Sequence, residues 1–256
     1  MAQYLLDTQN MTKRFGGVVA NLNINLSIEE GKTTGLIGPN GSGKTTFINQ
    51  VSGIYHPTSG KIIFKGQDIT NLSAHEIAKR GVARTFQRIQ LFNRMTVLEN
   101  VLVSRKNFMH SNLLDVVLNS KRLRREEQEQ HDKALEILEL LGLQEDAEKM
   151  PAKLPYGKRR ALEIARALAL EPSLLLLDEP AAGMTKEEFK EILAIMKMLR
   201  ERKVTMLLVE HTMEFIRQAV DDVYVINFGE VIAHGPFEEI EKDEAVIAAY
   251  LGDDDE

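Results

Sequence analysis

The sequence Gly38-Pro39-Asn40-Gly41-Ser42-Gly43-Lys44-Thr45 contains two glycines separated by four residues and followed by lysine and threonine. Residues 34–37 before it are suited to a buried strand, and residues 46–51 after it continue as a helix. A strand, this loop and a helix in that order form the phosphate-binding loop of nucleotide-binding proteins. All fixed positions of the motif are filled, so a chance match in a glycine-rich turn is disfavoured. The sequence therefore predicts a nucleotide-binding protein.

The residue types in this loop suit phosphate chemistry. Glycines let the chain wrap so that backbone N–H groups converge on an anion at the helix N-terminus. We expect Lys44 to reach the β- and γ-phosphates and the Thr45 hydroxyl to bind Mg²⁺. The residues expected to hold ATP or ADP here are Gly38, Pro39, Asn40, Gly41, Ser42, Gly43, Lys44, Thr45 and Thr46.

The composition is that of an ordinary globular protein. The 256 residues are 43% hydrophobic and 27% charged, which allows a single domain with a substantial core. No run approaches the roughly 18 apolar residues that span a bilayer, and the first residues lack a signal-peptide pattern, so we expect neither a membrane-spanning nor a secreted protein. The absence of cysteine excludes disulfides and thiolate chemistry and suits a cytoplasmic protein.

The charge argues against a nucleic-acid partner. The net charge is -6, and a basic cluster at residues 121–125 is followed directly by Glu126, Glu127 and Glu129. A nucleic-acid-binding surface would need a basic patch that is not neutralised in this way. We therefore expect residues 121–125 to form a solvated helix face.

The hydrophobic pattern divides the chain into three regions. Residues 4–37 alternate around a Gly16-Gly17 turn and residues 60–66 lie between glycines, which predicts strands. From about 73 to 170 the pattern is helical, with N-caps expected at Ser73 and Thr96. The predicted helices of this region include 97–104 and 128–141, and the later α/β alternation predicts strands at 173–177, 205–209, 223–226 and 231–234 and helices at 186–202 and 213–219.

Two acids follow a second apolar run. Leu174-Leu-Leu-Leu177 ends in Asp178 and Glu179, and ligands of parallel sheets lie at the carboxyl ends of the strands. We expect Asp178 to hold Mg²⁺, directly or through water, and Glu179 to polarise the attacking water or take its proton. Taken alone, the same residues fit a buried strand that runs into a loop. Together with the phosphate loop they favour a nucleotide hydrolase.

Between these elements lies Leu154-Pro155-Tyr156-Gly157-Lys158, followed by a helical segment that contains Ile164-Ala-Arg-Ala-Leu168. Here the chain resembles the ATP-binding-cassette (ABC) ATPases, whose signature loop precedes such a helix. The resemblance covers nearly the whole chain. It implies an α/β P-loop NTPase fold of ABC-ATPase type: a parallel-sheet core with an N-terminal antiparallel β-subdomain and an inserted helical subdomain. The implied organisation is one domain over 1–256, with the core and β-subdomain at 1–86 and 171–250, the helical subdomain at 87–170 and a disordered tail at 251–256.

The resemblance also implies roles for single residues. Phe15 matches the aromatic residue on which adenine stacks, and Gln87 matches the glutamine that contacts metal and water. His211 matches the switch histidine at the γ-phosphate, and residues 180–184 match the loop that contacts a second cassette. Each of these residues alone has an ordinary structural interpretation as a core, surface or loop residue. Only their joint order and spacing support the functional one.

The signature loop departs from the family's common Leu-Ser-Gly-Gly-Gln form. Pro155 lacks the hydroxyl and the N–H of serine, and Tyr156 replaces a glycine. Gly157 and the N-terminus of the following helix still offer free N–H groups to a γ-phosphate. Lys158, in place of glutamine, adds a charge of the useful sign. Thr212 replaces the aspartate expected after the switch histidine, and we attach no functional meaning to that change.

The Leu-Pro-Tyr-Gly form is similar to the larger ATPase subunit of bacterial branched-chain amino-acid importers. Phe15-Gly-Gly17, the segment 81–88 and the ending at 233–240 and 248–252 are similar to that subunit too. The resemblance implies an ATP-hydrolysing subunit that energises such an importer. Alternatives are the ATPase of another ABC system, for lipopolysaccharide export or urea or amide import, and a soluble ABC ATPase of translation or DNA repair. The last usually has two cassettes or a long coiled-coil insertion, which this chain lacks.

The implied partners are membrane-spanning permease subunits, a second ABC ATPase subunit or a second copy of this chain, and indirectly a substrate-binding protein. No nucleic acid is expected. The implied location is peripheral, on the cytoplasmic face of the inner membrane. Residues 88–95, with Val97 and Leu98, are either the docking site for a membrane subunit's coupling helix or an ordinary part of the subdomain core.

Overall fold

The structure is a computed structural model that describes residues 4–111, 115 and 120–251. The chain divides into two compact units, which are described separately. Unit 1 comprises residues up to Arg84 together with Ser173–Ala182 and the chain from Leu193, and unit 2 comprises Thr85–Pro172 and Gly183–Ile192. The segment Gly183–Ile192 belongs to unit 2 although it lies outside the range 87–170 expected for the helical subdomain.

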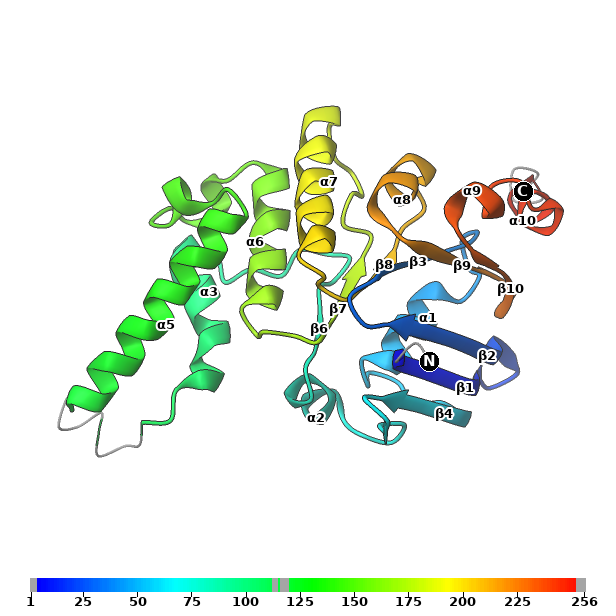
Figure 1. Ribbon diagram of the computed structural model, residues 1–256, viewed down its shortest axis with the longest axis horizontal. Coiled ribbons are helices and arrows are strands. Elements are labelled where there is room, and N and C mark those ends of the chain that lie inside the picture. Colours follow the sequence, from blue (N-terminus) through cyan, green and yellow to red (C-terminus); the bar gives the residue numbers. More distant parts are fainter. Residues whose placement is uncertain (1–3, 112–114, 116–119, 252–256) are drawn as a thin grey trace. The chain divides into compact units, whose positions relative to one another are not determined.

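A six-stranded sheet forms the centre of unit 1, in the order β10-β9-β3-β8-β7-β6 (Figure 1). The pairs that join β9, β3, β8, β7 and β6 are parallel, and β10 is antiparallel to β9. The strands β3, β7 and β8 are buried at every position, as expected for parallel strands with both faces covered. The strand bounds are β3 Thr33–Ile37, β6 Val82–Arg84, β7 Leu174–Asp178, β8 Met206–Val209, β9 Asp222–Asn227 and β10 Glu230–Gly235.

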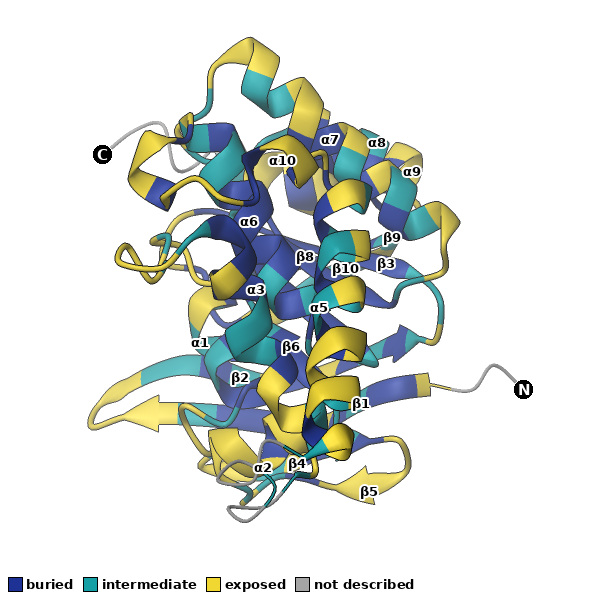
Figure 2. Ribbon diagram, turned by 90° about the vertical axis from the view of Figure 1, so that its left-hand side faces the viewer, coloured by how far each residue is buried: buried dark blue, intermediate teal, exposed yellow. Residues whose placement is uncertain are grey.

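A second sheet of unit 1 is antiparallel and has the order β2-β1-β4-β5. Its bounds are β1 Tyr4–Phe15, β2 Val18–Glu29, β4 Ser59–Phe64 and β5 Gln67–Asp68. Its edge strand β5 is exposed, whereas β3 and β8 of the other sheet are buried (Figure 2). This sheet is the antiparallel β-subdomain that the sequence predicts.

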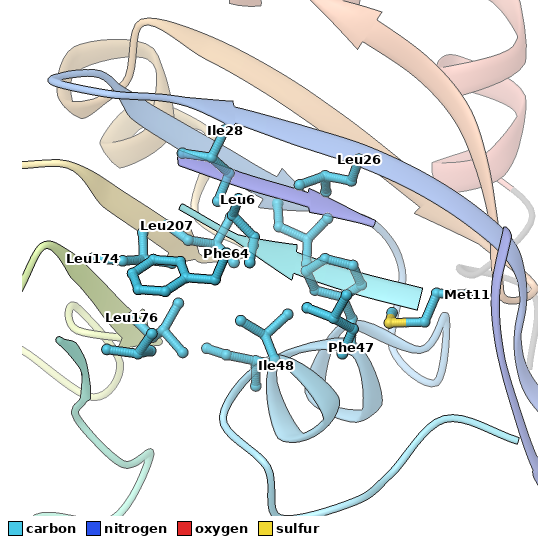
Figure 3. Close-up of a cluster of buried hydrophobic side chains, with 14 of the residues drawn as sticks. Leu6, Met11, Leu26, Ile28, Phe47, Ile48, Phe64, Leu174, Leu176 and Leu207 are labelled. Atoms are coloured by element: carbon cyan, nitrogen blue, oxygen red, sulfur yellow. The ribbon is translucent and has the colours of Figure 1, made fainter. Parts of the chain in front are cut away.

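The hydrophobic core of unit 1 joins the two sheets through helix α1 (Lys44–Val51). Phe47 and Ile48 of α1 are fully buried. Figure 3 shows them among side chains of both sheets, including Leu26, Phe64 and Leu176. The helix that follows the phosphate loop is therefore fixed by its apolar side. The other helices of unit 1 are α2 Ala74–Lys79, α8 Met213–Ala219, α9 Phe237–Ile240 and α10 Glu244–Leu251.

Unit 2 is built from helices. Its central helix is α6 (Tyr156–Leu168), which packs with α3 (Val97–Arg105) and α5 (Lys121–Leu140). The buried guanidinium of Arg105 connects them, because it donates to Gln130 Oε1 on α5 (2.9 Å) and to the Ala169 carbonyl at the end of α6 (3.0 Å). Helix α7 (Lys186–Glu201) begins in this unit, and its residues from Leu193 belong to unit 1. Short 3-10 turns occur at Lys106–Phe108, Gln144–Asp146 and Pro151–Lys153.

The elements that the sequence predicts are present, with differences at their ends. Ser73 and Thr96 form capping boxes with Glu76 and Glu99, as expected. Helix α5 begins at Lys121 rather than 128, so the basic cluster lies on a helix, where Leu123 is buried and the four basic side chains are exposed. Helix α10 includes Leu251, where a disordered tail was expected, and residues 252–256 lie outside the described residues.

We expect Phe47→Ala to lower the free energy of unfolding by about 3–5 kcal/mol, because it removes a fully buried ring from a packed core. Denaturant titration followed by circular dichroism measures this change. Phe228→Ala is the control, since that ring is 89% exposed and its loss should leave the unfolding midpoint unchanged. Equal midpoints for both variants would contradict the central place of α1 in the core.

Candidate nucleotide-hydrolysis site

Three loops leave the six-stranded sheet at one edge. Strand β8 lies between β3 and β7, and the parallel register aligns Leu36 with Val209 and Val209 with Asp178. Adjacent strands are about 4.8 Å apart, so the residues that follow these strand ends share a small region. The phosphate loop follows β3, Glu179 follows β7, and His211 follows β8 by two residues. The register thus brings together three elements that are far apart in the sequence.

The phosphate loop needs glycine at two crowded positions. A Cβ on Gly38 would lie 2.0 Å from the Ile226 carbonyl oxygen, and a Cβ on Gly43 would lie 2.4 Å from that of Ala20. Both glycines also have positive φ, +150° and +108°. No other residue type fits these positions without moving the backbone. The spacing of the motif is therefore explained by close approach of the loop to β9 and β2.

Lys44 is folded back onto the loop. Its Nζ donates to the carbonyl oxygens of Gly38 and Pro39, both at 2.7 Å, and the residue is 8% exposed. The Ser42 hydroxyl lies 3.5 Å from the same nitrogen. The cation is thus already held inside the loop by neutral acceptors, where an entering phosphate adds charge-assisted hydrogen bonds.

The start of α1 suits an anion. Its N-cap residue is Gly43 in the left-handed conformation, which gives no side-chain cap, and the first turn carries no acidic residue. The first N–H groups of a helix have no partner within the helix and carry the positive end of its dipole. Thr45 and Thr46 lie in this first turn, and Thr45 is exposed.

Hydrogen bonds from β2 and from the turn between β9 and β10 hold the phosphate loop in place. Asn21 on β2 donates to the Gly43 carbonyl oxygen (3.2 Å) and accepts from Gln50 on α1 (2.8 Å). The N–H of Gly229, in the turn between β9 and β10, donates to the Ser42 carbonyl oxygen (3.0 Å). These supports could not be identified from the sequence, because each joins residues that lie between 22 and 187 positions apart in the chain.

Asp178 ends β7 with its carboxylate balanced by a cation. Arg84 at the end of β6 donates from its guanidinium to Asp178 Oδ2 at 2.9 Å, and both side chains are nearly buried. The same guanidinium donates to Asn49 and Ser52 at the end of α1. The ion pair fixes the orientation of the Asp178 carboxylate. Arg84, which was not singled out from the sequence, connects β6, β7 and α1.

The donor set suits a magnesium ion that a nucleotide brings with it. Among residues 4–111, 115 and 120–251, no three His, Cys, Asp or Glu side chains are grouped so that they could hold a metal ion. Mg²⁺ is commonly bound through one or two carboxylates together with substrate phosphates and water. One carboxylate at Asp178 and one hydroxyl at Thr45 fit that pattern.

Glu179 has a strained backbone. Its φ is +47°, an uncommon conformation for a residue other than glycine. Its N–H donates to the Val209 carbonyl oxygen (2.8 Å), and its own carbonyl accepts from Ala182 N–H (3.2 Å). Such strain persists where the surroundings enforce it, and it is concentrated at functional sites. The turn ends β7 at Asp178. The Glu179 side chain therefore leaves the backbone in a different direction from that of a residue in a continued strand.

Glu210 connects the loop that carries His211 to the loop that follows Glu179. It is fully buried, and its Oε1 accepts the N–H groups of His211 (2.9 Å) and Thr212 (3.3 Å). Its other oxygen accepts the N–H of Ala181 at 3.2 Å. His211 itself is exposed, with Nδ1 3.3 Å from Glu210 Oε1. Glu210 was not predicted from the sequence, where its only signal is a carboxylate next to the switch histidine.

Phe15 lies in an aromatic corner at the end of β1. Its ring is 43% exposed and meets Tyr55 edge-on, with ring centroids 5.3 Å apart. Lys13 Nζ lies 5.1 Å from the Phe15 centroid and donates to the His56 carbonyl oxygen at 2.7 Å. An exposed ring that is held by a second ring is a suitable stacking platform for a base. Tyr55 was not expected from the sequence.

Gln87 belongs to unit 2, where α6 holds its backbone. Arg160, fully buried, donates to the carbonyl oxygens of Phe86 (2.8 Å) and Gln87 (3.0 Å). Glu163, one turn later, accepts from Phe86 N–H (3.2 Å) and pairs with Arg160 (2.7 Å). Burial raises the pKa of Glu163, and the charge of Arg160 opposes that shift. The Gln87 side chain is exposed.

The signature loop differs from expectation in two contacts. The sequence analysis predicted a free N–H at Gly157, which is wrong: this N–H donates to Glu188 Oε1 at 2.8 Å. The charge of Lys158 was expected to serve the nucleotide, but Lys158 Nζ donates to the buried Asp146 at 2.5 Å. Lys149 and then Lys158 hold the pKa of Asp146 below its usual value. The remaining N-terminus of α6 has no side-chain cap.

The segment 88–95, with Val97 and Leu98, carries both buried and exposed apolar side chains. Val97 and Leu98 are buried and belong to the core of unit 2. Phe92 and Met95 are 42% and 36% exposed. The Arg166 guanidinium on α6 lies 4.6 Å from the Phe92 ring and also donates to the Gln90 carbonyl oxygen. The exposed apolar surface is therefore restricted to the part of the segment before α3.

The site residues are thus divided between the two units. Phe15, the phosphate loop, Asp178, Glu179 and His211 lie in unit 1, and Gln87 and Gly157 lie in unit 2. A sheet edge with a phosphate loop, a paired acid and a following glutamate defines a P-loop nucleotide-binding protein. The chemical roles expected for these residues stay predictions.

Comparison with known proteins identifies the family. The model of the ABC transporter family matches residues 22–182, which is more than half of the chain. The chain belongs to the ABC transporter family. A second family model, described as a branched-chain amino acid ATP-binding cassette transporter, matches residues 230–256.

Curated relatives match over their whole length. The chain is 41% identical over 254 residues to BraF of Pseudomonas aeruginosa, a high-affinity branched-chain amino acid transport ATP-binding protein, and 99% of this chain and 100% of that protein are covered. It is equally similar to LivG of Escherichia coli, which carries the same description. LivG of Archaeoglobus fulgidus is also 41% identical, with 98% of this chain and 96% of that protein covered.

Solved structures with the same fold are ABC cassettes. One is the ADP conformation of an ATP-binding cassette of an ABC transporter, with a TM-score of 0.84, 33% identity and coverage of 98% of this chain and 99% of that chain. Another is a dimeric cassette in a post-hydrolysis state bound to ADP and phosphate, with a TM-score of 0.75, 27% identity and coverage of 91% and 98%. The α/β ABC-ATPase fold predicted from the sequence is confirmed.

We expect Lys44→Met to weaken ATP binding by about 10- to 100-fold, since charge-assisted hydrogen bonds are worth about 1.5–3 kcal/mol and a factor of ten is about 1.4 kcal/mol. Titration calorimetry with Mg²⁺-ATP measures the change. Lys61→Met, at an exposed position of β4, is the control and should bind as the unchanged protein does. Unchanged affinity in Lys44→Met would remove the phosphate-loop assignment.

Proposed function

We propose that this protein is the ATP-hydrolysing subunit of a membrane ABC importer for branched-chain amino acids. The observation that carries the proposal is the common sheet edge at which the phosphate loop, Asp178–Glu179 and His211 follow adjacent strands. The full-length similarity to BraF and LivG supports the choice of substrate, because those proteins are described as branched-chain amino acid transport ATP-binding proteins. No feature of the described residues favours the export or soluble alternatives.

In the proposed mechanism the chain's own groups position ATP. Phe15 stacks on the adenine, and Lys44 with the first N–H groups of α1 holds the β- and γ-phosphates. Thr45, Gln87 and Asp178 would hold Mg²⁺, which when bound neutralises phosphate charge as the transition state forms. Arg84 keeps the Asp178 carboxylate in its direction at 2.9 Å.

Glu179 is the proposed general base. It accepts a proton from water as the water oxygen bonds to the γ-phosphorus and the bond to the bridging oxygen of ADP breaks, which gives ADP and inorganic phosphate. The left-handed turn at Glu179 sets its direction, and His211 contacts the γ-phosphate from the neighbouring loop. Glu210 fixes both loops through three N–H groups and so maintains their spacing.

A complete site in this proposal needs two cassettes. Gly157 and the N-terminus of α6 in one cassette face the γ-phosphate held by the phosphate loop of the other, and residues 180–184 contact the second cassette. ATP then drives closure only by its greater affinity for the closed pair. The second cassette is another ABC ATPase subunit or a second copy of this chain.

The proposed assembly is peripheral to the membrane, at the cytoplasmic face of the inner membrane. Among the residues that the structure describes, no helix is both long and apolar enough to cross a bilayer. In this proposal, permease subunits supply the transport path. The exposed Phe92 and Met95 are the proposed contact with such a subunit, and a substrate-binding protein would deliver the amino acid.

We expect Glu179→Gln to separate binding from chemistry. The amide keeps the shape of the side chain but cannot accept the proton, so hydrolysis should fall by about 10²–10⁴-fold while Mg²⁺-ATP binds at least as well. Phosphate release and calorimetry measure the two properties. Normal hydrolysis would show that Glu179 is not the base, and loss of ATP binding would show a structural role.

The importer assignment is tested in proteoliposomes. The protein, its permease subunits and the companion ATPase are reconstituted with the substrate-binding protein and labelled leucine. We expect ATP-dependent uptake that unlabelled isoleucine and valine reduce. Urea and short amides should not compete. ATP hydrolysis without leucine uptake would leave the ATPase assignment intact and overturn the choice of substrate.

A further inference from the structure

The N-terminus of the signature helix α6 is bound by a carboxylate of the same unit. Glu188 Oε1 accepts the Gly157 N–H at 2.8 Å. Glu188 Oε2 accepts the N–H and the hydroxyl of Thr185, both at 3.1 Å, and Glu188 N–H donates to Thr185 Oγ1 at 3.3 Å. Glu188 therefore closes the first turn of α7 with one oxygen and reaches Gly157 with the other.

This contact is a close, charge-assisted hydrogen bond. A Cβ on Gly157 would lie 3.0 Å from Glu188 Cγ, so the absence of a side chain at Gly157 is what admits Glu188. The N–H groups of Gly157 and then Thr185 lower the pKa of Glu188, so the carboxylate is charged at neutral pH. The N–H that the proposed function assigns to the γ-phosphate therefore already faces an anion.

We propose that Glu188 is an internal substitute for the γ-phosphate, which holds the signature helix until the nucleotide of a second cassette displaces it. This inference rests on the proposed function. The N–H of Gly157 cannot donate a full hydrogen bond to two anions, and two anions at one helix N-terminus repel each other. Cassette closure thus requires the Glu188 side chain to leave Gly157.

The unusual signature loop makes this single N–H more important. Pro155 has neither an N–H nor a hydroxyl, and Lys158 is engaged by Asp146. The first turn of α6 presents the N–H groups of Tyr156, Gly157 and Lys158, and the Gly157 N–H is the one that Glu188 holds. Glu188 therefore occupies one of the N–H groups that the signature loop can offer to a phosphate.

The same carboxylate extends the effect to the loop before α7. Thr185 directly follows residues 180–184, the segment expected to contact the second cassette. When Glu188 leaves Gly157, its other oxygen can remain on Thr185, so the start of α7 stays capped. The displaced state is therefore accessible without unwinding α7.

An ordinary helix cap would have the opposite effect in an experiment. If Glu188 serves only to stabilise α7 and α6, removing its charge should leave ATP-driven association unchanged or weaken it. If Glu188 competes with the γ-phosphate, removing its charge should strengthen association. The sign of the change therefore separates a competing group from a structural one.

The test uses the full chain with Glu188→Gln, Glu188→Asp and the control Glu187→Gln, which removes a charge from the same helical turn at an exposed position. Aspartate keeps the charge near Thr185 but is one carbon too short to reach Gly157 as well. Association with the companion ATPase, or with a second copy, is followed by light scattering as Mg²⁺-AMP-PNP is added. Calorimetry gives AMP-PNP affinity of the separate chain, and thermal unfolding verifies that each variant is folded.

We expect both Glu188 variants to associate at AMP-PNP concentrations about three- to tenfold lower than the unchanged protein, because neither variant places a charged carboxylate on the Gly157 N–H. In the assembled complex the KM for ATP should fall likewise. The AMP-PNP affinity of the separate chain and the association curve of Glu187→Gln should not change.

Association at equal or higher AMP-PNP concentration in a folded Glu188 variant overturns this inference. If the unchanged chain does not bind AMP-PNP, the proposed function itself fails. If one variant does not fold, the other decides.

Discussion

The parallel pairing of β3, β8 and β7 is the constraint on which the site depends. These strands are buried at every position, so their register is fixed by packing on both faces. Leu36, Val209 and Asp178 are level in that register. A slip of one residue in β7 would turn Asp178 to the other face of the sheet and move the strained turn at Glu179 away from the phosphate loop. Burial of aliphatic side chains thus sets the geometry of the polar ones.

Three buried charged side chains at this edge have partners within the protein. Arg84 faces Asp178, three N–H groups face Glu210, and two loop carbonyls face Lys44. Burying an unpaired charge would cost several kcal/mol, on the order of the whole stability of a domain. The internal partners therefore let the site exist before a nucleotide enters. An entering phosphate therefore meets a Lys44 ammonium that two carbonyl oxygens already hold in the loop.

Much of the fold and the main site elements could be predicted from the sequence, because their signals are local. The phosphate loop, the acids after a leucine run and the capping boxes at Ser73 and Thr96 are each defined within a few residues. The supports were not predictable, because Arg84, Glu210 and Tyr55 gain their meaning from tertiary contacts. The positive φ of Glu179 could not be predicted from the sequence. Glycine is the residue that indicates left-handed backbone, and a glutamate occupies this position.

The error at the signature loop has the same physical origin. Helix N-termini leave N–H groups without helical partners, so free donors at Gly157 were a reasonable expectation. The partner of this N–H is Glu188, which lies 31 residues later in the chain. Glu188 also forms a capping box with Thr185 at the start of α7, a local pattern that was not singled out from the sequence. Nothing local indicated that its second oxygen would reach another helix.

Helix α6 connects the remaining functional features of unit 2. Gly157 lies in its first turn, Arg160 and Glu163 hold the backbone at Phe86 and Gln87, and Arg166 contacts the segment with Phe92. The helix has 13 residues and so extends about 20 Å at 1.5 Å per residue. Because the Arg160–Glu163 pair is buried and hydrogen-bonded at both ends, the Gln87 backbone moves with α6 rather than independently. A change of partner at Gly157, from Glu188 to a phosphate, therefore acts on the same rigid element that positions Gln87 and the exposed apolar residues proposed to meet the membrane subunit.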